Sequence, residues 1–398
     1  MEAVPIRAAR IARVPIAAAH GRTLAQDVCA AEDVPPFARS RVDGYAVDAA
    51  DVAGAARDRP SHLRVVGEVM MGALAPGSIR RGEAMRVPTG GALPSGANAA
   101  VMIEDTAEEN GSVAVYDASD ALENVTAAAA DVRAGAPLFS AGTVITPPKA
   151  GLLAGAGIDA VDVRCPPRVG LLLTGDELVE PGRPLRGGEI RDINRYSLTA
   201  ALRAFGCEAI LFDRVPDDRQ ALAAAFAVAL ERCDAVVVSG GSSAGERDYT
   251  PSVVAEAGAP GVVVHHIRAK PGRPTLLGAV GDVLVIGLPG NPVSALVMLE
   301  VVGKPLLSRM LGRRADDIPY RATLRAGISV SKGLEHRIPV RLHRDGDRIA
   351  ADPLFGTSAQ MHILAHADAL VTVPLGTGDI AAGTVVDAYP FATSPWLA

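Results

Sequence analysis

The chain has few of the features that mark secreted, membrane-spanning or nucleic-acid-binding proteins. Its four cysteines, at positions 29, 165, 207 and 233, lie far apart and form no Cys-x-x-Cys pair, which argues against a disulfide framework and a zinc ribbon. Its most apolar run, Ala221 to Leu230, has ten residues and is too short to span a bilayer. The formal charge of −6 supplies no basic field that would attract nucleic acid. We therefore expect no membrane and no nucleic acid among its partners.

Aromatic residues are also scarce, at 4% of the chain, so the cores must be built from small aliphatic side chains. A length of 398 residues exceeds what one compact core accommodates and predicts roughly two to four domains. The first residues include arginines but no sustained apolar stretch and no cleavage-site pattern, so no secretory signal is expected. Together with the cysteine pattern, this predicts a reduced, cytoplasmic protein.

The spacing of apolar residues changes along the chain and predicts separate folding units. Between residues 31 and 131, short β-like runs alternate with Gly- and Pro-rich turns, which predicts a small β domain. From Arg168, strand patterns alternate with amphipathic helix patterns, and a long closing helix is expected at residues 291–312. That alternation predicts a mainly parallel α/β sheet whose ligand site lies at the carboxyl ends of its strands. A last β-rich segment begins near Pro319.

A short polar loop follows one of these strands. The β-branched run Val236–Val238 ends in Ser239, Gly240, Gly241 and Ser242. Backbone N–H groups in such a loop form an anion-binding nest, to which the start of a following helix adds partial positive charge. The alternative is an ordinary strand-to-helix turn without a ligand. The serines and the Glu-Arg-Asp-Tyr-Thr segment that follows favour a site, because a simple turn needs none of them.

A second strand ends in the same manner at Thr174 and Gly175, with Asp176 and Glu177 directly after them. Carboxylates at this position suit Mg²⁺, which prefers carboxylate oxygens combined with substrate phosphates. The alternative is that Asp176 caps a helix. Since two strands deliver acidic residues to the same edge of the sheet, a site is favoured.

Two further loops carry prolines and polar residues. In Pro289-Gly290-Asn291-Pro292, Asn291 suits a helix N-cap and Pro292 suits the first helical position. Helix capping alone explains this loop. Its place beside the other loops favours ligand contact as well. In the stiff turn at 270–274, Lys270 and Arg273 supply two cations suited to an anionic substrate. A solvated basic turn is an equally good interpretation of that fragment.

Taken together, several segments resemble the molybdopterin molybdenumtransferase family, which includes the MoeA proteins and the gephyrin E domains. The matching segments follow the family's order over roughly residues 5–312 and include PPFARSRVDGYAV, RVPTGGALPSGANAAVMIED, LLLTGDELVEPG, INRYSLTAALRAFG, SGGSSAGERDYT, KPGRP and LPGNPVSA. Such an ordered set is far more specific than any single motif.

The resemblance implies a multidomain α/β plus β fold in a homodimer. Its parts would be a connector domain (1–30 and 132–165), the small β domain (31–131), a three-layer α/β/α molybdopterin-binding domain with a mainly parallel sheet (166–313) and a C-terminal β-barrel (314–398). It further implies insertion of molybdate into adenylylated molybdopterin, with Mg²⁺ as cofactor and release of AMP. A molybdopterin adenylyltransferase and recipient molybdoenzymes would be partners.

The resemblance also assigns roles to individual residues. Asp43, whose Asp-Gly turn by itself predicts only a structural role, becomes a functional acid that acts across the dimer. The expected catalytic residues are Asp43, Asp131, Glu177, Asp248 and Lys270, with Asp43, Glu177 and Asp248 also expected at the metal. The expected pterin-nucleotide contacts are Thr89, Gly90, Thr174, Gly175, Ser239, Gly240, Gly241, Ser242, Arg273, Pro289, Gly290 and Asn291.

The chain departs from the family pattern in two segments. Where the family has Asn-Val-Arg-x-x-Gly-Glu-Asp, residues 124–131 have Thr126 in place of the arginine and Ala130 in place of the glutamate. In 357–365, His362 and Ile363 replace two serines. These changes leave open a non-catalytic molybdopterin-binding scaffold as the alternative to an enzyme. A nucleotide hydrolase on the same α/β domain is a third interpretation, but it would not need the segment around Asp43.

Overall fold

The structure is a computed structural model that describes residues 4–240, 248–313, 318–392 and 394. The chain divides into two compact units, one formed by residues 1–12 and 164–398 and the other by residues 13–163. Among the helices in the described ranges, none is long and apolar enough to cross a membrane.

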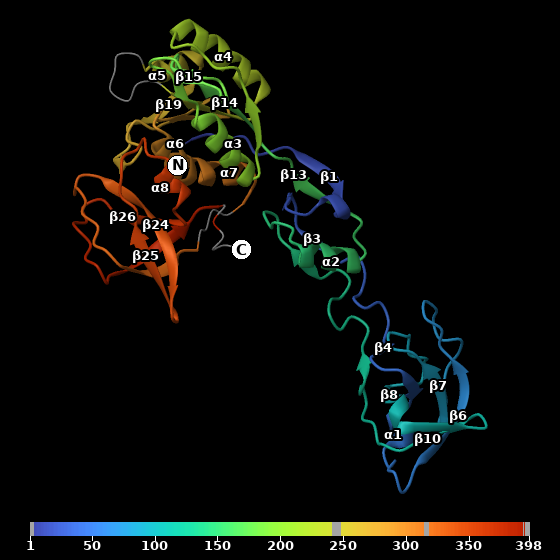
Figure 1. Ribbon diagram of the computed structural model, residues 1–398. Coiled ribbons are helices and arrows are strands. Elements are labelled where there is room, and N and C mark those ends of the chain that lie inside the picture. The colour runs from blue at the N-terminus through green and yellow to red at the C-terminus, as the bar shows by residue number, and fades with distance from the viewer. Residues whose placement is uncertain (1–3, 241–247, 314–317, 393, 395–398) are drawn as a thin grey trace. The chain divides into compact units, whose positions relative to one another are not determined.

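The larger unit contains a six-stranded sheet with strand order β17-β14-β18-β22-β21-β19. Two of its strands, β14 and β19, are labelled in Figure 1. Strands β17, β14, β18 and β22 run parallel, whereas β21 lies antiparallel to β22 and β19 antiparallel to β21. The strands are β14 (Arg168–Leu173), β17 (Glu208–Leu211), β18 (Ala235–Ser239), β19 (Pro260–His265), β21 (Leu276–Val280) and β22 (Val283–Leu288). The prediction of a mainly parallel sheet is therefore confirmed.

Helices cover both faces of this sheet. Successive side chains of a strand point to opposite faces, so Leu171 packs in the core that includes Leu198 and Met298, whereas Leu172 packs with Phe226 and Val254. The helices are α3 (Asn194–Ala204), α4 (Arg219–Arg232), α5 (Thr250–Ala257), α6 (Pro292–Met298) and α7 (Lys304–Met310). Since α3, α6 and α7 contribute to one core and α4 and α5 to the other, the domain has the predicted three layers.

The closing helix differs from the single long α-helix that the sequence predicts. A π-helical segment, Leu299–Gly303, joins α6 to α7. Pro305 follows it, and a proline inside an α-helix removes one backbone hydrogen bond and clashes with the carbonyl four residues before it. The wider π turn accommodates that clash. The helix ends near Gly312, whose φ of 67° is easily adopted by glycine.

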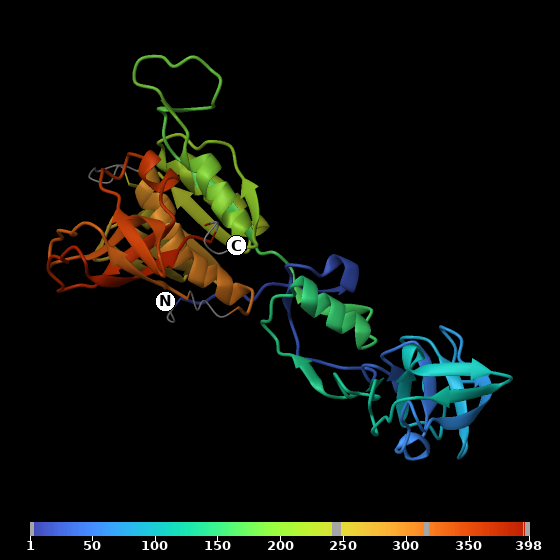
Figure 2. The ribbon, with the colours of Figure 1, turned by 60° about the horizontal axis from the view of Figure 1, so that its bottom comes forward.

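The C-terminal strands form a closed barrel, as predicted. The barrel closes because β24 pairs with both β25 and β26, and its core includes Val340, Leu342 and Val371. Its strands are β23 (Tyr320–Leu324), β24 (Glu335–Asp345), β25 (Arg348–Pro353), β26 (Ala369–Val373) and β27 (Val385–Pro390), with the short helix α8 (His362–Ala365). Figure 2 shows the barrel strands, in orange and red, beside the orange helix α6, and Val293 and Val297 of that helix pack against the barrel.

The smaller unit also contains a six-stranded sheet, with order β8-β5-β7-β6-β10-β9. Its core is formed by small aliphatic residues around one buried aromatic side chain, Tyr45. The sheet consists of β5 (Gly44–Val47), β6 (Ser61–Glu68), β7 (Glu83–Val87), β8 (Ala99–Met102), β9 (Thr106–Glu109) and β10 (Ser112–Val115).

The rest of that unit consists of short strands with two helices, α1 (Ala49–Val52) and α2 (Pro147–Gly155). The strands β1 (Ile11–Pro15), β13 (Ala160–Arg164) and β2 (Thr23–Leu24) form one sheet; β3 (Val28–Cys29) pairs with β12 (Pro137–Phe139), and β4 (Arg39–Ser40) pairs with β11 (Val125–Thr126). The four-part domain boundaries given above stay a prediction.

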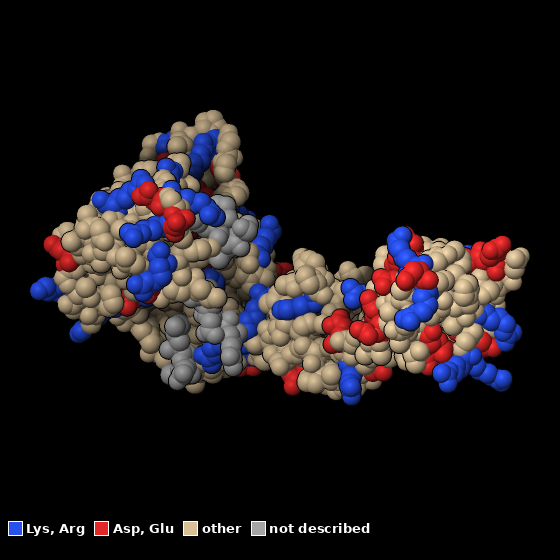
Figure 3. Space-filling view, turned by 90° about the horizontal axis from the view of Figure 1, so that it is seen from below, with Lys and Arg blue, Asp and Glu red and all other residues tan. Residues whose placement is uncertain are grey.

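Surface charge is mixed on the face that Figure 3 shows, where Lys and Arg side chains alternate with Asp and Glu. The sequence has 39 basic and 45 acidic residues, so neither sign dominates by number. Local charge at each cleft therefore matters more for ligand choice than the field of the whole chain.

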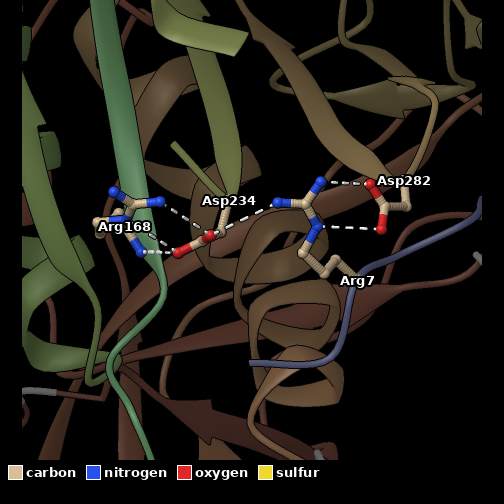
Figure 4. Close-up of polar contacts among 4 residues, drawn as sticks. All are labelled: Arg7, Arg168, Asp234 and Asp282. Atoms are coloured by element: carbon tan, nitrogen blue, oxygen red, sulfur yellow. Dashed lines mark hydrogen bonds and ion pairs between the residues drawn. The ribbon is translucent and has the colours of Figure 1, made fainter. Parts of the chain in front are cut away.

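An ionic cluster holds the amino ends of three parallel strands together (Figure 4). Asp234, which precedes β18, accepts a hydrogen bond from the backbone N–H of Arg168 at 2.8 Å and lies 3.9 Å from the Arg7 guanidinium. Arg7 also donates two hydrogen bonds to Asp282, which precedes β22. These bonds hold the pKa of Asp282 below its usual value. The N-terminal segment is thereby tied to the sheet.

Replacing Asp234 by alanine is expected to lower the free energy of unfolding of this unit by about 2–3 kcal/mol, because a buried N–H and two cations lose their acceptor. Asp282→Ala is the matched control, since that side chain is 54% exposed compared with 5% for Asp234. Its loss should stay below about 1 kcal/mol. Urea unfolding followed by circular dichroism measures both, and equal losses would contradict the assigned importance of burial.

Candidate functional site

Three strand-end loops predicted from the sequence come together at the carboxyl edge of the α/β sheet. Leu173 of β14 pairs with Ser239 of β18, and Ser239 pairs with Leu288 of β22, so the three strands end at the same level. The loops line a cleft of about 580 Å³. Its lining includes Thr174, Gly175, Glu177, Ser239, Gly240, Gly290 and Asn291, all of which the sequence predicts as site residues. Gly241 and Ser242 lie outside the described residues.

A buried hydrogen-bond network fixes the loops that line this cleft. The Asn194 side chain, at the start of α3, donates from Nδ2 to Ser239 Oγ at 3.0 Å and to Gly290 O at 2.9 Å. Ser239 Oγ in turn donates to Pro289 O at 3.2 Å. The Ser239 hydroxyl is therefore engaged within the protein and positions the loops, whereas the sequence predicts that it contacts the ligand directly.

Two glycines in these loops occupy positions where a side chain would be too close to its neighbours. A Cβ on Gly240, whose φ is 137°, would lie 2.1 Å from Thr174 Oγ1 and 2.6 Å from Thr174 O. A Cβ on Gly175, whose φ is 141°, would lie 2.9 Å from a carboxylate oxygen of Glu177. Gly240 thus allows the ends of β14 and β18 to approach each other, and Gly175 allows the chain to turn tightly after β14.

Acidic side chains surround the cleft. Glu177, Asp192 and Asp217 line it, and Asp217 also borders a small neighbouring pocket with Asp248. Burial raises the pKa of Asp192, which accepts a hydrogen bond from the backbone N–H of Arg195 at 2.9 Å. Asp248 accepts a hydrogen bond from the backbone N–H of Thr250, at the start of α5. The edge of the sheet therefore offers several carboxylates to a ligand or a cation.

Asp176 does not cap a helix. The residues after it form the short strand β15 (Leu178–Val179), paired with β16 (Ile190–Arg191). That alternative interpretation is therefore wrong, because the chain turns back on itself after the strand end. The sequence alone does not single out Asp192 or Asn194 as site residues. Its one indication is that these two polar residues stand just before and at the start of a helix pattern.

A second cleft, of about 850 Å³, lies between the α/β sheet edge and the barrel. Lys270, Arg273 and Arg337 line it, and Asn291 lines both clefts. Lys270 belongs to a short strand, β20 (Ala269–Lys270), which pairs with the start of β24, whereas the sequence predicts a turn. Cationic side chains thus gather next to the acidic cleft.

The position of Asn291 is as predicted, but its side chain acts differently. It occupies the N-cap position of α6 without making a capping hydrogen bond. Instead its Nδ2 donates to Ser358 Oγ at 3.0 Å. Ser358 belongs to the 357–365 segment, of which Thr357 and Ile363 also line the second cleft. The altered segment therefore forms part of the cationic cleft.

In the smaller unit, the structure brings Asp43 and Thr89 together. Asp43 Oδ1 accepts a hydrogen bond from the backbone N–H of Thr89 at 2.8 Å, and Gly90 follows directly. The Asp131 side chain is exposed. Ala129, at the position of the family's glycine in the 124–131 segment, has a φ of 55°, a left-handed conformation that costs roughly 1–2 kcal/mol for a residue with a side chain.

The fold and the clefts define a multidomain α/β protein with two neighbouring clefts at the carboxyl ends of its parallel strands. Three family models match the chain: the MoeA N-terminal region (domain I and II) at residues 1–157, the probable molybdopterin binding domain at 170–309, and the MoeA C-terminal region (domain IV) at 321–391. The chain belongs to the molybdopterin molybdenumtransferase family, whose members are enzymes.

Individual relatives match over nearly the whole chain. Molybdopterin molybdenumtransferase 2 of Mycobacterium tuberculosis is 33% identical, with 96% of each chain covered. The molybdopterin molybdenumtransferase of Bacillus subtilis is 31% identical, covering 92% of this chain and 86% of its own length. The crystal structure of the molybdopterin biosynthesis MoeA protein of Pyrococcus horikosii superposes with a TM-score of 0.85 at 34% identity, covering 97% of this chain and 95% of that chain.

Gly240→Ala is expected to weaken ligand binding at the cleft by at least about tenfold, because the new methyl group would push the ends of β14 and β18 apart. Gly187→Ala is the matched control, since its Cβ would meet no atom within 4 Å. Titration with 6-hydroxymethylpterin, followed by calorimetry, compares the two. Unchanged affinity in the Gly240 variant would contradict the inference that the cleft requires Gly240 and Thr174 to lie close together.

Proposed function

We propose that this protein inserts molybdate into adenylylated molybdopterin and releases AMP. The observation that carries the proposal is the convergence of three strand-end loops on one cleft, joined through Asn291 to a cationic cleft. Molybdate, the adenylyl phosphates and the dithiolene are anionic, so a cationic cleft beside the strand ends suits them.

Magnesium is proposed as the cofactor. Among the described residues no group of three or more His, Cys, Asp or Glu side chains is placed to hold a metal. Mg²⁺ does not require such a set, because one or two carboxylates, waters and substrate phosphates complete its shell. Glu177 and Asp248, at neighbouring pockets of the sheet edge, would hold it there. Bound Mg²⁺ would neutralise charge on the phosphoanhydride as the phosphate bond breaks.

The chain's own residues divide the remaining work. Lys270 and Arg273 would hold the anionic substrate in the second cleft, and the backbone at Gly240 and Gly290 would orient the part that occupies the first. Asp43, held by the Thr89 N–H, would act on the substrate bound by a second copy of the chain in a homodimer. We place the protein in the cytoplasm, between a molybdopterin adenylyltransferase and recipient molybdoenzymes.

A non-catalytic molybdopterin-binding scaffold is the second candidate. Thr126 and Ala130, which replace a family arginine and glutamate, favour it because they remove two charged groups. A scaffold would bind the pterin tightly without cleaving the phosphoanhydride.

The deciding experiment incubates the protein with adenylylated molybdopterin, molybdate and Mg²⁺ and measures AMP by chromatography. We expect AMP release that stops when EDTA removes the metal. Asp248→Ala should lower turnover by about 100-fold or more while substrate affinity changes less. Glu231→Ala, which alters an exposed acid on α4, is the control. Tight binding of substrate by the wild-type chain without AMP release would support the scaffold instead.

Mixing two inactive variants tests the action of Asp43 across the dimer. Equal amounts of Asp43→Ala and Asp248→Ala, dissociated and reassembled, should recover about a quarter of wild-type AMP release, because half of the dimers are mixed and each mixed dimer has one intact site. If both acids served one site within a single chain, no mixed dimer would contain an intact site. Absence of recovery, with exchange of subunits verified by mass, would therefore place Asp43 and Asp248 in the same chain's site.

A further inference from the structure

One buried polar atom at the first cleft lacks a hydrogen-bond partner. Asn194 Oδ1 is buried and meets no donor among the residues that the structure describes. The orientation of the amide is fixed by its neighbours, because Gly290 O accepts only and must face Nδ2. A buried acceptor without a donor costs about 1–3 kcal/mol. Since Asn194 lines the cleft, a ligand that brings a donor would recover that cost.

Acceptors predominate around this atom. Among the described residues, the charged side chains that line the cleft are the carboxylates of Glu177, Asp192 and Asp217 and the guanidinium of Arg191. The Arg191 guanidinium already donates to Glu180 O at 2.7 Å. The described part of the cleft therefore suits a group that presents several N–H donors.

We propose that Asn194 Oδ1 accepts a hydrogen bond from the 2-amino group of the pterin, and that this cleft recognises the pyrimidine edge of the pterin. This rests on the proposed function, because it assigns one end of that substrate to one cleft. Asn194 is then a specificity-determining residue. Its Nδ2 donates to Ser239 and Gly290 of the loops, and its Oδ1 accepts from the ligand.

The substrate has two ring systems, the pterin and the adenine, and their hydrogen-bond donors and acceptors indicate that the pterin occupies the first cleft. A pterin carries its 2-amino group next to the ring N3–H, so two donors stand side by side and suit an amide oxygen in a cleft lined by carboxylates. The amino group of adenine is flanked by ring nitrogens that only accept. Those nitrogens would face carboxylate oxygens in this cleft and be repelled. The dithiolene, which is anionic, belongs by charge in the second cleft, with Lys270 and Arg273.

The first test varies the ligand and leaves the protein unchanged. The probes are 6-hydroxymethylpterin and 6-hydroxymethyl-lumazine, which differ in having an amino group or an oxygen at carbon 2. We expect the lumazine to bind roughly tenfold to hundredfold more weakly, because its oxygen would face Asn194 Oδ1. Equal affinities, or no binding of either probe, would overturn the proposal. Displacement of the pterin by AMP but not by inosine monophosphate would also overturn it, in favour of adenine.

The second test separates the two functions of Asn194. Asn194→Asp and Asn194→Leu both lose the hydrogen bonds that Nδ2 donates, but only the aspartate keeps an acceptor toward the cleft. The aspartate variant should prefer pterin over lumazine, whereas the leucine variant should bind both equally. Ser197→Ala is the matched control, because Ser197 Oγ is another buried atom on α3 without a described partner but lines a different cavity. Its preference should equal that of the wild type.

Two results distinguish failure of this proposal from failure of the proposed function. Release of AMP from adenylylated molybdopterin without preference for pterin over lumazine would overturn the role of Asn194 and leave the insertase intact. Preference for pterin without AMP release would support the role of Asn194 on a scaffold. Thermal unfolding of each variant checks its fold. If a variant does not fold, the comparison of pterin and lumazine binding to the wild-type protein tests the role of Asn194.

Discussion

The site depends on the parallel strands β14, β18 and β22 ending at the same level, and on one side chain that holds those ends in place. Asn194 Nδ2 bonds to the end of β18 and to the loop after β22, from the first turn of α3. Gly240 lets the end of β18 approach Thr174 at the end of β14. Without these contacts the loops would have no fixed relation, and no cleft of defined shape would exist.

The opposite end of the sheet is held by charge. Arg7, Arg168, Asp234 and Asp282 surround the amino ends of β14, β18 and β22, and Asp234 is the most buried of the four. Between the two ends, small aliphatic side chains fill two cores, one on each face. Such side chains have few rotamers to lose, so packing fixes the strands at modest cost in conformational entropy. The rigid sheet can therefore carry irregular loops at its functional edge.

Charge divides the functional edge into two parts. The cleft beside Asn194 has mainly acceptors, whereas the cleft against the barrel has Lys270, Arg273 and Arg337. Asn291 lies between them. A substrate with a donor-rich heterocycle at one end and anionic groups along its length matches this division. Orientation would then follow from electrostatics before any specific contact forms.

The sequence by itself determined the α/β pattern, the barrel strands and the loops that carry glycine, acid and cation, because these depend on periodicity and on local turn chemistry. The ordered motifs also identified the family. Only the tertiary structure decided that Asn194 lies against Ser239 and Gly290, that Lys270 joins a barrel strand, and that Asn291 bonds to Ser358 in place of capping its helix. Each of these contacts joins residues more than forty positions apart, and such pairings follow from how strands and helices pack, which local patterns do not specify.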